Sequence, residues 1–178
     1  MKNLPGDKTK EEIIESMIRV DHAGEYGATR IYAGQLAVLK CKESEKVIRH
    51  MADQEEVHLK EFSEMVGKRK VRPTVLLPLW HVAGYALGAT TALLGEKAAM
   101  ACTVAVEEVI DEHYSNQLEL LGEDEADLKK TISKFRAEEL EHRDMALQNK
   151  AQEAPAYHVL SAAVKGASRL AIWLSERI

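Results

Sequence analysis

The sequence has few of the residues that interrupt or cross-link a chain. Of its 178 residues only 4 are proline, 2 are cysteine and 5% are aromatic. Two cysteines, Cys41 and Cys102, are too few for a disulfide framework, so we expect buried or incidental thiols in a reducing compartment. Long stretches rich in Ala, Leu, Glu and Lys without breaks favour helix, and we predict an all-α fold.

An excess of basic residues is also missing. The formal net charge is -5 and the pI is about 5.8, which excludes a typical nucleic-acid-binding protein. A chain of 178 residues with 46% hydrophobic residues can bury a sizeable core, and we expect one domain over residues 1–178. Residues 1–12 lack the apolar core of a signal peptide and the Arg-rich, acid-poor pattern of a transit peptide, so we expect no targeting segment there.

Formal charge is absent from one long stretch, residues 73–95. Its 23 residues would be long enough to span a bilayer, but Pro78, His81, three glycines and three threonines argue against a spanning helix. We expect instead a crossover helix that is buried or lies on a membrane surface. The stretch is preceded by a basic cluster that suits either anionic lipid headgroups or a solvated loop, namely Lys68, Arg69, Lys70 and Arg72.

Turn residues and apolar stripes predict six helices. Four core helices are expected at about residues 11–40, 44–67, 96–121 and 124–149, and two apolar helices at about 74–95 and 156–177. Ser44 is a candidate N-cap for the second helix. Gly122 marks the end of the core helix predicted at 96–121. The last helix, apolar with basic flanks, suits a membrane interface, a partner groove or packing against the bundle.

The first candidate metal ligands are two Glu-x-x-His pairs, Glu55/His58 and Glu139/His142. Positions three apart on a helix share one face, so each pair can reach one metal ion. In a chain with 22 Glu and 7 His such a pair means little alone. Ferritin-like dinuclear carboxylate proteins combine two such pairs with one further Glu on each of two other helices.

The positions of these residues along the chain make the case for a shared metal site. Glu25 and the Glu55/His58 pair are equidistant from the turn at residues 41–44, and Glu107 and the second pair are equidistant from the turn after Gly122. Antiparallel helices joined by a short turn therefore place each Glu level with its own pair. Small residues beside Glu25, namely Gly24 and Gly27, either let a helix or ligand approach closely or are tolerated glycines.

The two halves of the chain also repeat. Glu107 follows Glu25 by 82 residues, and the second Glu-x-x-His pair follows the first by 84. Tyr32 and Tyr114 each lie seven residues after the lone Glu, on the metal-facing stripe about 10 Å further along the helix. We interpret the pattern as a duplicated two-helix unit.

Six residues thus form a candidate dinuclear metal site: Glu25, Glu55, His58, Glu107, Glu139 and His142. Four buried carboxylates would repel one another, and two divalent ions would balance their charge. Imidazole and carboxylate ligands suit iron or manganese, whereas the lack of usable thiolates argues against structural zinc. We expect the neighbouring Glu56, Glu108, Glu138 and Glu141 to point elsewhere, although Glu138, four residues before His142, leaves a shifted register open.

Longer strings resemble the demethoxyubiquinone hydroxylase family of ubiquinone biosynthesis over nearly the whole chain. The strings lie at residues 19–25, 31–35, 86–103, 139–142, 154–157 and 174–177. The resemblance implies a ferritin-like four-helix bundle whose two iron ions are held by the six residues above. Glu55, Glu107 and either Glu25 or Glu139 would then bridge or chelate the irons.

The resemblance also implies the reaction. The expected activity is hydroxylation of the ring of a demethoxyubiquinol with O2 and electrons ultimately from NADH. By the same likeness Tyr114 and His113 are catalytic candidates for quinone and electron handling, while an exposed helix histidine is the plain alternative for His113. No Gly-rich fingerprint follows a strand, so NADH would bind without a Rossmann domain.

A polyprenyl quinone lives in the bilayer, so such an enzyme needs an apolar entrance, which the 74–95 and 156–177 helices would supply. We expect a peripheral protein on an inner membrane, at the mitochondrial matrix face or the cytoplasmic face of a bacterial cell membrane. A lipid-presenting partner protein is expected from the family, and a homo-oligomer is compatible with the sequence. Two alternatives are a rubrerythrin-like peroxidase and a non-catalytic ferritin-like iron-binding protein.

Overall fold

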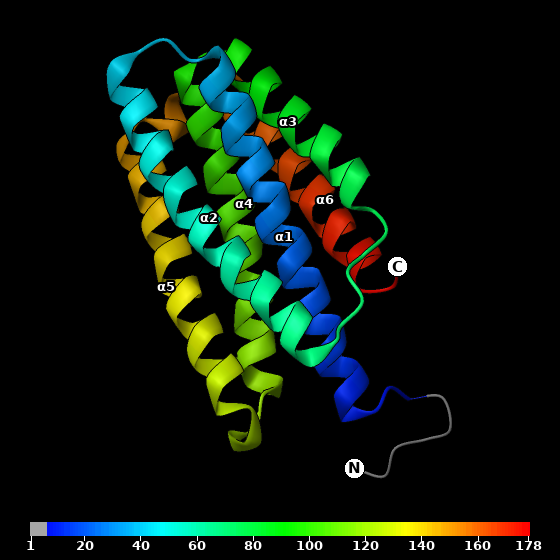
Figure 1. The fold of residues 1–178 in the computed structure, drawn as a ribbon. Helices are drawn as coiled ribbons and strands as arrows, with labels where there is room; N and C mark the ends of the chain where they lie inside the picture. Colours follow the sequence, from blue (N-terminus) through cyan, green and yellow to red (C-terminus); the bar gives the residue numbers. More distant parts are fainter. Residues whose placement is uncertain (1–6) are drawn as a thin grey trace.

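The computed structural model describes residues 7–178, and every regular element in that range is a helix (Figure 1). Six α-helices follow one another as α1 (Lys10–Val38), α2 (Lys42–Arg69), α3 (Leu77–Leu93), α4 (Glu96–Leu120), α5 (Ala126–Gln148) and α6 (Tyr157–Ser175). Short 3-10 turns, Glu123–Glu125 and Ala151–Glu153, precede α5 and α6. The all-α prediction is confirmed, and each helix lies within about three residues of its predicted range.

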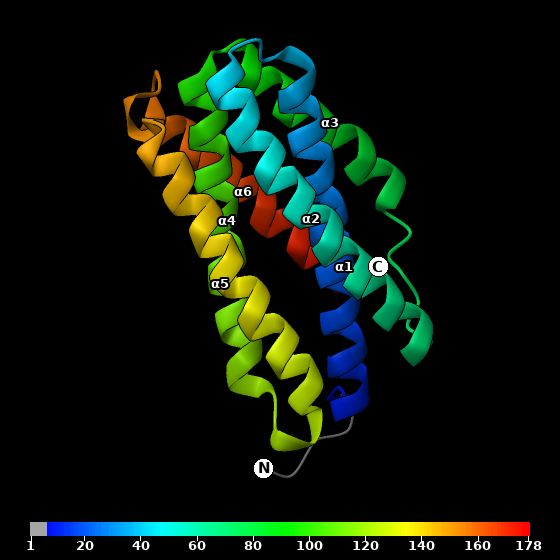
Figure 2. The ribbon, with the colours of Figure 1, turned by 60° about the vertical axis from the view of Figure 1, so that its left-hand side comes forward.

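The helices form three layers, with α1 and α4 in the middle (Figures 1 and 2). On one side α2 packs on α1 and α5 packs on α4, which completes the predicted ferritin-like four-helix bundle. On the other side α3 covers α1 and α6 covers α4. The repeat predicted for two helices therefore extends to a third, because each half ends in an apolar helix that covers the first helix of its own half.

Local sequence explains how α1 begins, but not how α2 begins. The Thr9 hydroxyl accepts from the Glu12 amide and the Glu12 carboxylate accepts from the Thr9 amide, a capping box that starts α1. The N-cap predicted at Ser44 is wrong, because α2 begins at Lys42 and is preceded by Cys41. Ser44 lies within the first turn, and its hydroxyl donates instead to Glu96 at 2.7 Å, which ties the start of α2 to the start of α4.

Two apolar clusters occupy the two ends of the bundle interior. One contains Tyr32, Met51 and the alanines at the start of α4, and the other contains Tyr114, Phe62 and Phe135. Side chains in both clusters are almost completely removed from water. The charged residues of the interior lie between these clusters, so they are shielded from solvent along the bundle axis.

The charge-free stretch forms α3, which lies against α1 at backbone distance. A methyl group added at Gly88 would overlap the Ile31 carbonyl, and one added at Gly34 would overlap the Tyr85 carbonyl. Only glycine allows this approach. The outer face of α3 is apolar and exposed, with Val82 65% and Leu93 74% accessible.

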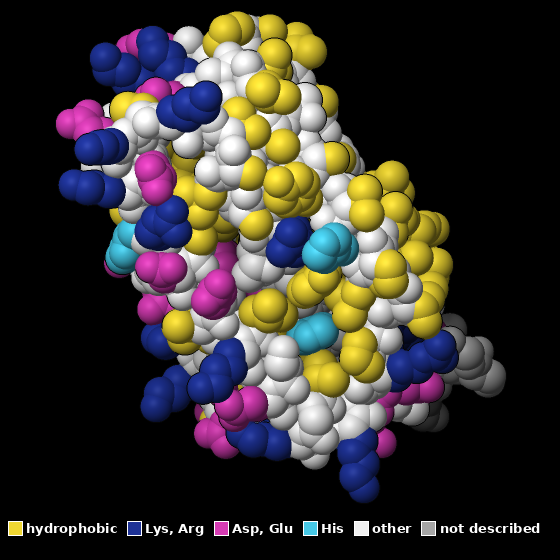
Figure 3. Space-filling model, turned by 45° about the horizontal axis from the view of Figure 1, so that its top comes forward, with side chains coloured by type: hydrophobic (Ala, Val, Ile, Leu, Met, Phe, Trp, Pro, Cys, Tyr) yellow, Lys and Arg dark blue, Asp and Glu magenta, His cyan; other side chains and the backbone are white. Residues whose placement is uncertain are grey.

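None of the helices described between residues 7 and 178 combines the length and apolar character that crossing a bilayer requires. Figure 3 shows hydrophobic side chains gathered on the α3 side of the molecule, whereas charged side chains gather on the side of α2 and α5. The two sides therefore present different chemistry to their surroundings.

Candidate metal centre

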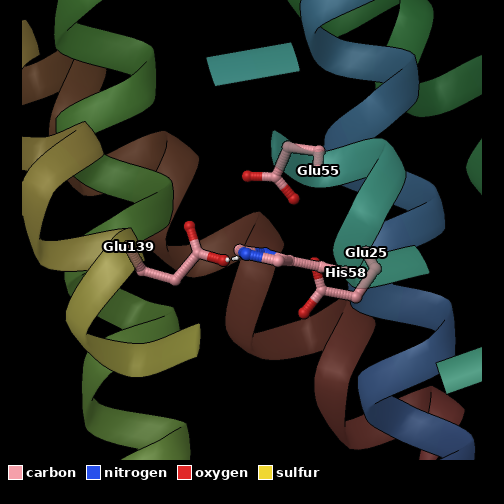
Figure 4. A group of neighbouring side chains, drawn as sticks. All are labelled: Glu25, Glu55, His58 and Glu139. Atoms are coloured by element: carbon pink, nitrogen blue, oxygen red, sulfur yellow. Dashed lines mark hydrogen bonds and ion pairs between the residues drawn. The ribbon is translucent and has the colours of Figure 1, made fainter. Parts of the chain in front are cut away.

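The six predicted ligands converge midway along the bundle, between the two apolar clusters. None of the six is more than 2% exposed. Their ligand atoms form two overlapping groups, each with all atoms within 4.8 Å of one another. One group is Glu25, Glu55, His58 and Glu139, and the other is Glu55, Glu107, Glu139 and His142. Figure 4 shows the first group, in which three helices contribute and the His58 ring points across the bundle to Glu139.

Both histidines turn Nδ1 toward the carboxylates. His58 Nδ1 lies 3.0 Å from Glu139 Oε1 and 3.5 Å from Glu25 Oε2. His142 Nδ1 lies 3.0 Å from Glu139 Oε2 and 3.3 Å from Glu55 Oε1. The Nδ1 atoms are therefore the ring atoms that could bind an ion between the helices.

The opposite ring nitrogens point outward to acceptors. His58 Nε2 donates to Glu138 Oε2 at 2.8 Å, and His142 Nε2 donates to Gln54 Oε1 at 3.0 Å. Glu138 is in neither ligand group, as expected, but its carboxylate supports a ligand of the other half from outside the carboxylate cluster. The shifted register is also resolved, since Glu139 rather than Glu138 joins both groups.

Several buried carboxylate oxygens have no hydrogen-bond partner. Both oxygens of Glu55, Oε2 of Glu25 and Oε2 of Glu107 are in this state. A buried acceptor without a partner costs free energy, and native proteins satisfy nearly all such groups. Divalent cations would satisfy these oxygens and balance their charge, so the donor set fits a dinuclear metal site.

Burial and crowding set the protonation of the carboxyls. Burial and the neighbouring carboxylates raise the pKa of Glu55 and of Glu107 well above the usual range. Burial also opposes ionisation of Glu139, but hydrogen bonds from His142 and His58 prevail and hold its pKa at about 2. Burial lowers the pKa of His58, yet its hydrogen bonds to Glu139 and Glu25 raise that pKa to about 10. Without ions, protons therefore take the place of cations, and metal binding would release them.

Each tyrosine of the repeat binds the lone Glu of the other half. The Tyr32 hydroxyl donates to Glu107 Oε1 at 2.9 Å, and the Tyr114 hydroxyl donates to Glu25 Oε1. Burial and the adjacent carboxylates raise the pKa of both phenols well above 10.0, so both remain protonated. The tyrosines thus hold Glu25 and Glu107 in place from opposite ends of the site.

His113 lies outside the six-residue cluster, in a polar group with Asp21 and Gln117. Its Nε2 is 3.3 Å from Asp21 Oδ1 and 2.9 Å from Gln117 Nε2, and Gln117 donates to Asp21 at 2.7 Å. Burial would lower the pKa of His113, but the hydrogen bond to Asp21 raises it. His113 is therefore half-buried and held, unlike the exposed helix histidine of the plain alternative.

Three polar residues of the site region, Asp21, Gln54 and Gln117, were not predicted, and Glu138 was considered only as a ligand in a shifted register. Gln54 and Glu138 each directly precede the Glu of a Glu-x-x-His pair and are 84 residues apart, so the repeat itself was a signal for them. Asp21 lies one helical turn before Glu25 on the same face of α1. Cys102 is buried near this region, and burial raises the pKa of its thiol to about 12.

An apolar cavity of about 260 Å³ lies among α1, α3, α4 and α6. Gly24 and Gly27 of α1 line it, and a methyl group at either would meet no atom within 4 Å. A second cavity of about 10 Å³ is lined by Tyr32 and Glu107 and shares three wall residues with the first, namely Ala28, Ile31 and Val106. The three shared residues therefore separate the apolar cavity from the small cavity beside Glu107.

Comparison with known proteins gives consistent matches. A family model described as "Ubiquinone biosynthesis protein COQ7" matches residues 12–175. The chain is 60% identical to the 3-demethoxyubiquinol 3-hydroxylase of Rhodospirillum rubrum, over 98% of this chain and 83% of that protein. It is 54% identical to the "NADPH-dependent 3-demethoxyubiquinone 3-hydroxylase, mitochondrial" of Homo sapiens, over 97% of this chain and 81% of that protein. The corresponding 5-demethoxyubiquinone hydroxylase of Saccharomyces cerevisiae is 42% identical, over 93% and 78%.

Proposed function

Because the chain belongs to the COQ7 family of ubiquinone biosynthesis proteins, as its sequence strings predicted, we propose that it hydroxylates the ring of a demethoxyubiquinol at a dinuclear iron site. The observation that carries the proposal is the pair of overlapping buried Glu/His groups with unpartnered carboxylate oxygens. The relatives' names supply the reaction class. O2 is the proposed co-substrate.

The two groups suggest how the ligands divide. Glu25 and His58 would hold one iron, Glu107 and His142 would hold the other, and Glu55 and Glu139 belong to both groups and would be shared. Oxygen and imidazole donors suit iron. When bound, the iron supplies the redox chemistry with O2 that side chains lack. Since each group draws ligands from both halves, we also propose that residues 1–178 act as one domain.

The chain's own residues would exclude water and position protons. The apolar clusters at the two ends of the bundle interior keep solvent from the site. Tyr114, a protonated phenol bound to Glu25, is proposed to hold a proton at that carboxylate during the reaction. His113 is proposed to assist from the adjoining polar group, where Asp21 fixes its ring.

The apolar cavity is the proposed entrance for the quinone. Its volume of about 260 Å³ is near the lower end of small-molecule pockets, which run from roughly 300 to 1,000 Å³. A ring with the first part of a polyprenyl tail suits such a space. Gly24 and Gly27 leave room for it beside Glu25, which favours the interpretation that these glycines admit a ligand.

Exposed apolar side chains on α3 and α6 support attachment to a membrane surface. Leu79 and Val82 project from α3, and Val159, Leu170 and Trp173 project from α6. We propose peripheral binding to an inner membrane, on the matrix face in mitochondria, which the names of the mitochondrial relatives suit, or on the cytoplasmic face in bacteria. A lipid-presenting partner protein and self-association remain part of this proposal.

The electron source is proposed to be a reduced nicotinamide nucleotide. The family resemblance predicts NADH, whereas the human relative is named NADPH-dependent. Oxidation of each nucleotide by iron-loaded protein, followed with and without a demethoxyquinone, would identify the donor. The expected result is oxidation that depends on the quinone.

Metal content tests the site. Purified protein loaded with ferrous iron is expected to bind close to two ions per chain, and His142→Ala is expected to lose the dinuclear pair. His50→Ala, on the exposed side of α2, is the matched control and should keep both ions. Full iron content in His142→Ala would contradict the ligand assignment.

Quinone content tests the reaction. Cells that lack the gene are expected to accumulate a demethoxyquinone and to recover ubiquinone when the wild-type chain is restored. Normal quinone content in such cells would refute the proposed substrate. Peroxide reduction by the loaded protein without quinone hydroxylation would favour the rubrerythrin-like alternative, and iron binding with neither activity would favour the ferritin-like one.

A further inference from the structure

We propose that Glu138 and Gln54 are positioning residues that support the two site histidines unequally, so that the His58 half of the site binds a divalent cation more tightly than the His142 half. The inference rests on the metal site of the proposed function. It adds that the two ion positions differ, and it names the residues that make them differ.

The support is reciprocal between the halves. Glu138, on α5, accepts a hydrogen bond from His58 of α2 at 2.8 Å. Gln54, on α2, accepts one from His142 of α5 at 3.0 Å. In both halves the supporting residue directly precedes the Glu of the Glu-x-x-His pair. The geometry is thus repeated, while the acceptor is a carboxylate in one case and an amide in the other.

The outward hydrogen bonds define what each ring can do. In the neutral ring that binds a metal ion, an acceptor on Nε2 keeps the remaining proton there and directs the Nδ1 lone pair at the carboxylate cluster. The ring of His58 is fixed further by stacking on Phe135, with centroids 3.9 Å apart. The edge of the Tyr32 ring limits His142 similarly, with centroids 6.4 Å apart. Both rings are therefore held in a pose suited to metal binding.

The difference in charge makes the two rings unequal. A carboxylate acceptor raises the basicity of a metal-bound imidazole more than a neutral amide does, because charge-assisted hydrogen bonds are about twice as strong. Lys134 lies 3.6 Å from Oε1 of Glu138, which leaves Oε2 to His58. Lys134 is largely exposed, so solvent screens its effect on the carboxylate. His58 should therefore be the stronger donor.

Exchanging the two acceptors provides the test. Glu138→Gln gives both histidines amide partners, Gln54→Glu gives both carboxylate partners, and the double variant reverses the original arrangement. All three changes nearly preserve side-chain size. Glu141→Gln, on the exposed face of the same helix, is the matched control. Circular dichroism and thermal unfolding of the metal-free variants would show that each is folded.

Stepwise Co²⁺ binding to metal-free protein, followed by calorimetry and visible absorption, is the measurement. We expect two separated steps in the wild type and in Glu141→Gln. Glu138→Gln should weaken the tighter step about ten-fold and bring the two steps together. Gln54→Glu should tighten the weaker step by a similar factor, and the double variant should again show two separated steps.

Other outcomes overturn the inference. If Glu138→Gln and Gln54→Glu leave both steps unchanged, or if Glu138→Gln weakens only the weaker step, the unequal support is wrong although two ions still bind. Equal steps in the wild type would have the same meaning. Failure of the wild type to bind any divalent ion would instead contradict the proposed function, so the two failures are distinguishable.

Discussion

Glu55 and Glu139 occupy equivalent positions in the two halves of the chain and both are buried, yet their pKa values shift in opposite directions. The Glu139 oxygens accept hydrogen bonds from His58 and His142, and its pKa is about 2. The Glu55 oxygens have no hydrogen-bond partner, and its pKa is raised well above the usual range. A repeated sequence therefore fixes where a carboxyl stands, but its neighbours decide whether it carries charge.

The covering helices differ between the halves as well. α3 touches the backbone of α1 through Gly34 and Gly88. Gly166, the one glycine of α6, is exposed, and a methyl group added there would meet no atom within 4 Å. The apolar cavity opens between these two covers. α3 is therefore fixed against α1 at backbone distance, and the cavity between α3 and α6 leaves space for a ligand.

Changing pH should have the largest effect, because it acts on the unequal carboxyls. Raising the pH from 5 to 7 is expected to destabilise the metal-free protein. Glu55 and Glu107 keep protons above the ordinary pKa of 4.5, whereas the unfolded chain releases them. Each retained proton lowers the free energy of unfolding by about 1.4 kcal/mol per pH unit. Glu139, with a pKa of about 2, is ionised in both states and adds no slope in this range.

Urea unfolding of chelator-treated protein at several pH values would measure this slope. His58, with its pKa raised to about 10, adds a loss of the same sign above pH 6.5. Glu55→Gln should flatten the slope by about one proton, and added metal should remove most of it. Stability that rises between pH 5 and 7 in the metal-free protein would contradict the assignment of protons to Glu55 and Glu107.

The second-largest effect is expected when one methyl group is added to each covering helix, α3 in the first half and α6 in the second. Gly88→Ala is expected to cost about 3 kcal/mol, because the methyl overlaps the Ile31 carbonyl and α3 must move away from α1. Gly166→Ala is expected to be neutral or stabilising by up to about 1 kcal/mol, because alanine favours helix and the site is open. Thermal unfolding of both variants is the measurement. Equal melting temperatures would contradict the close approach of α3 to α1 at Gly88.

The two tyrosines allow a smaller and more selective comparison. Tyr32→Phe and Tyr114→Phe each remove one buried hydrogen bond, to Glu107 and Glu25, and each should cost about 1–2 kcal/mol of stability. If Tyr114 is the catalytic residue, only Tyr114→Phe should lower turnover of the loaded enzyme, by about 100-fold. Parallel measurement of iron content separates this loss from loss of metal. Equal turnover in the two variants would remove Tyr114 from the catalytic assignment.

The smallest effect is expected from removing the hydrogen bond that joins the two covering helices, α3 and α6. Trp80 of α3 donates its indole N–H to the Ser175 hydroxyl of α6 at 3.0 Å, and both residues line the apolar cavity. Ser175→Ala is expected to cost about 1 kcal/mol or less and to increase hydrogen exchange in α6 more than in α3. Exchange mass spectrometry is the measurement. Faster exchange confined to α3 would show that α3, and not α6, is the less firmly held of the two covering helices.

The sequence was informative wherever helix geometry alone decides position. Glu25 and Glu107 could be predicted to lie at the same height as the Glu-x-x-His pairs, because the rise per residue and the position of the turn determine height in a helical hairpin. The direction of Glu138 could not be predicted this way. A residue next to a ligand lies about 100° around the helix, and whether that direction meets the other half depends on how the two helices are rotated. The prediction of Ser44 as N-cap failed because α2 begins three residues earlier than that cap would place it.

The cavity was the other feature that the sequence left out. Glycines at positions 24 and 27 suggested a close approach, but a space among four helices depends on how far α6 stands from α4. Side-chain types do not specify that distance. The catalytic roles of Tyr114 and His113 likewise stay predictions, because their surroundings show what holds them and not what they do.

The division of ligands between the halves has an evolutionary reading. Each group of ligand residues takes three members from one half and one from the other, so neither half completes an ion site alone. A shorter ancestor with a single three-helix unit would have needed two copies, related by a twofold axis, to enclose two equivalent ions. Fusion of such copies would release that symmetry and let equivalent positions differ, as Gln54 and Glu138 do in this chain.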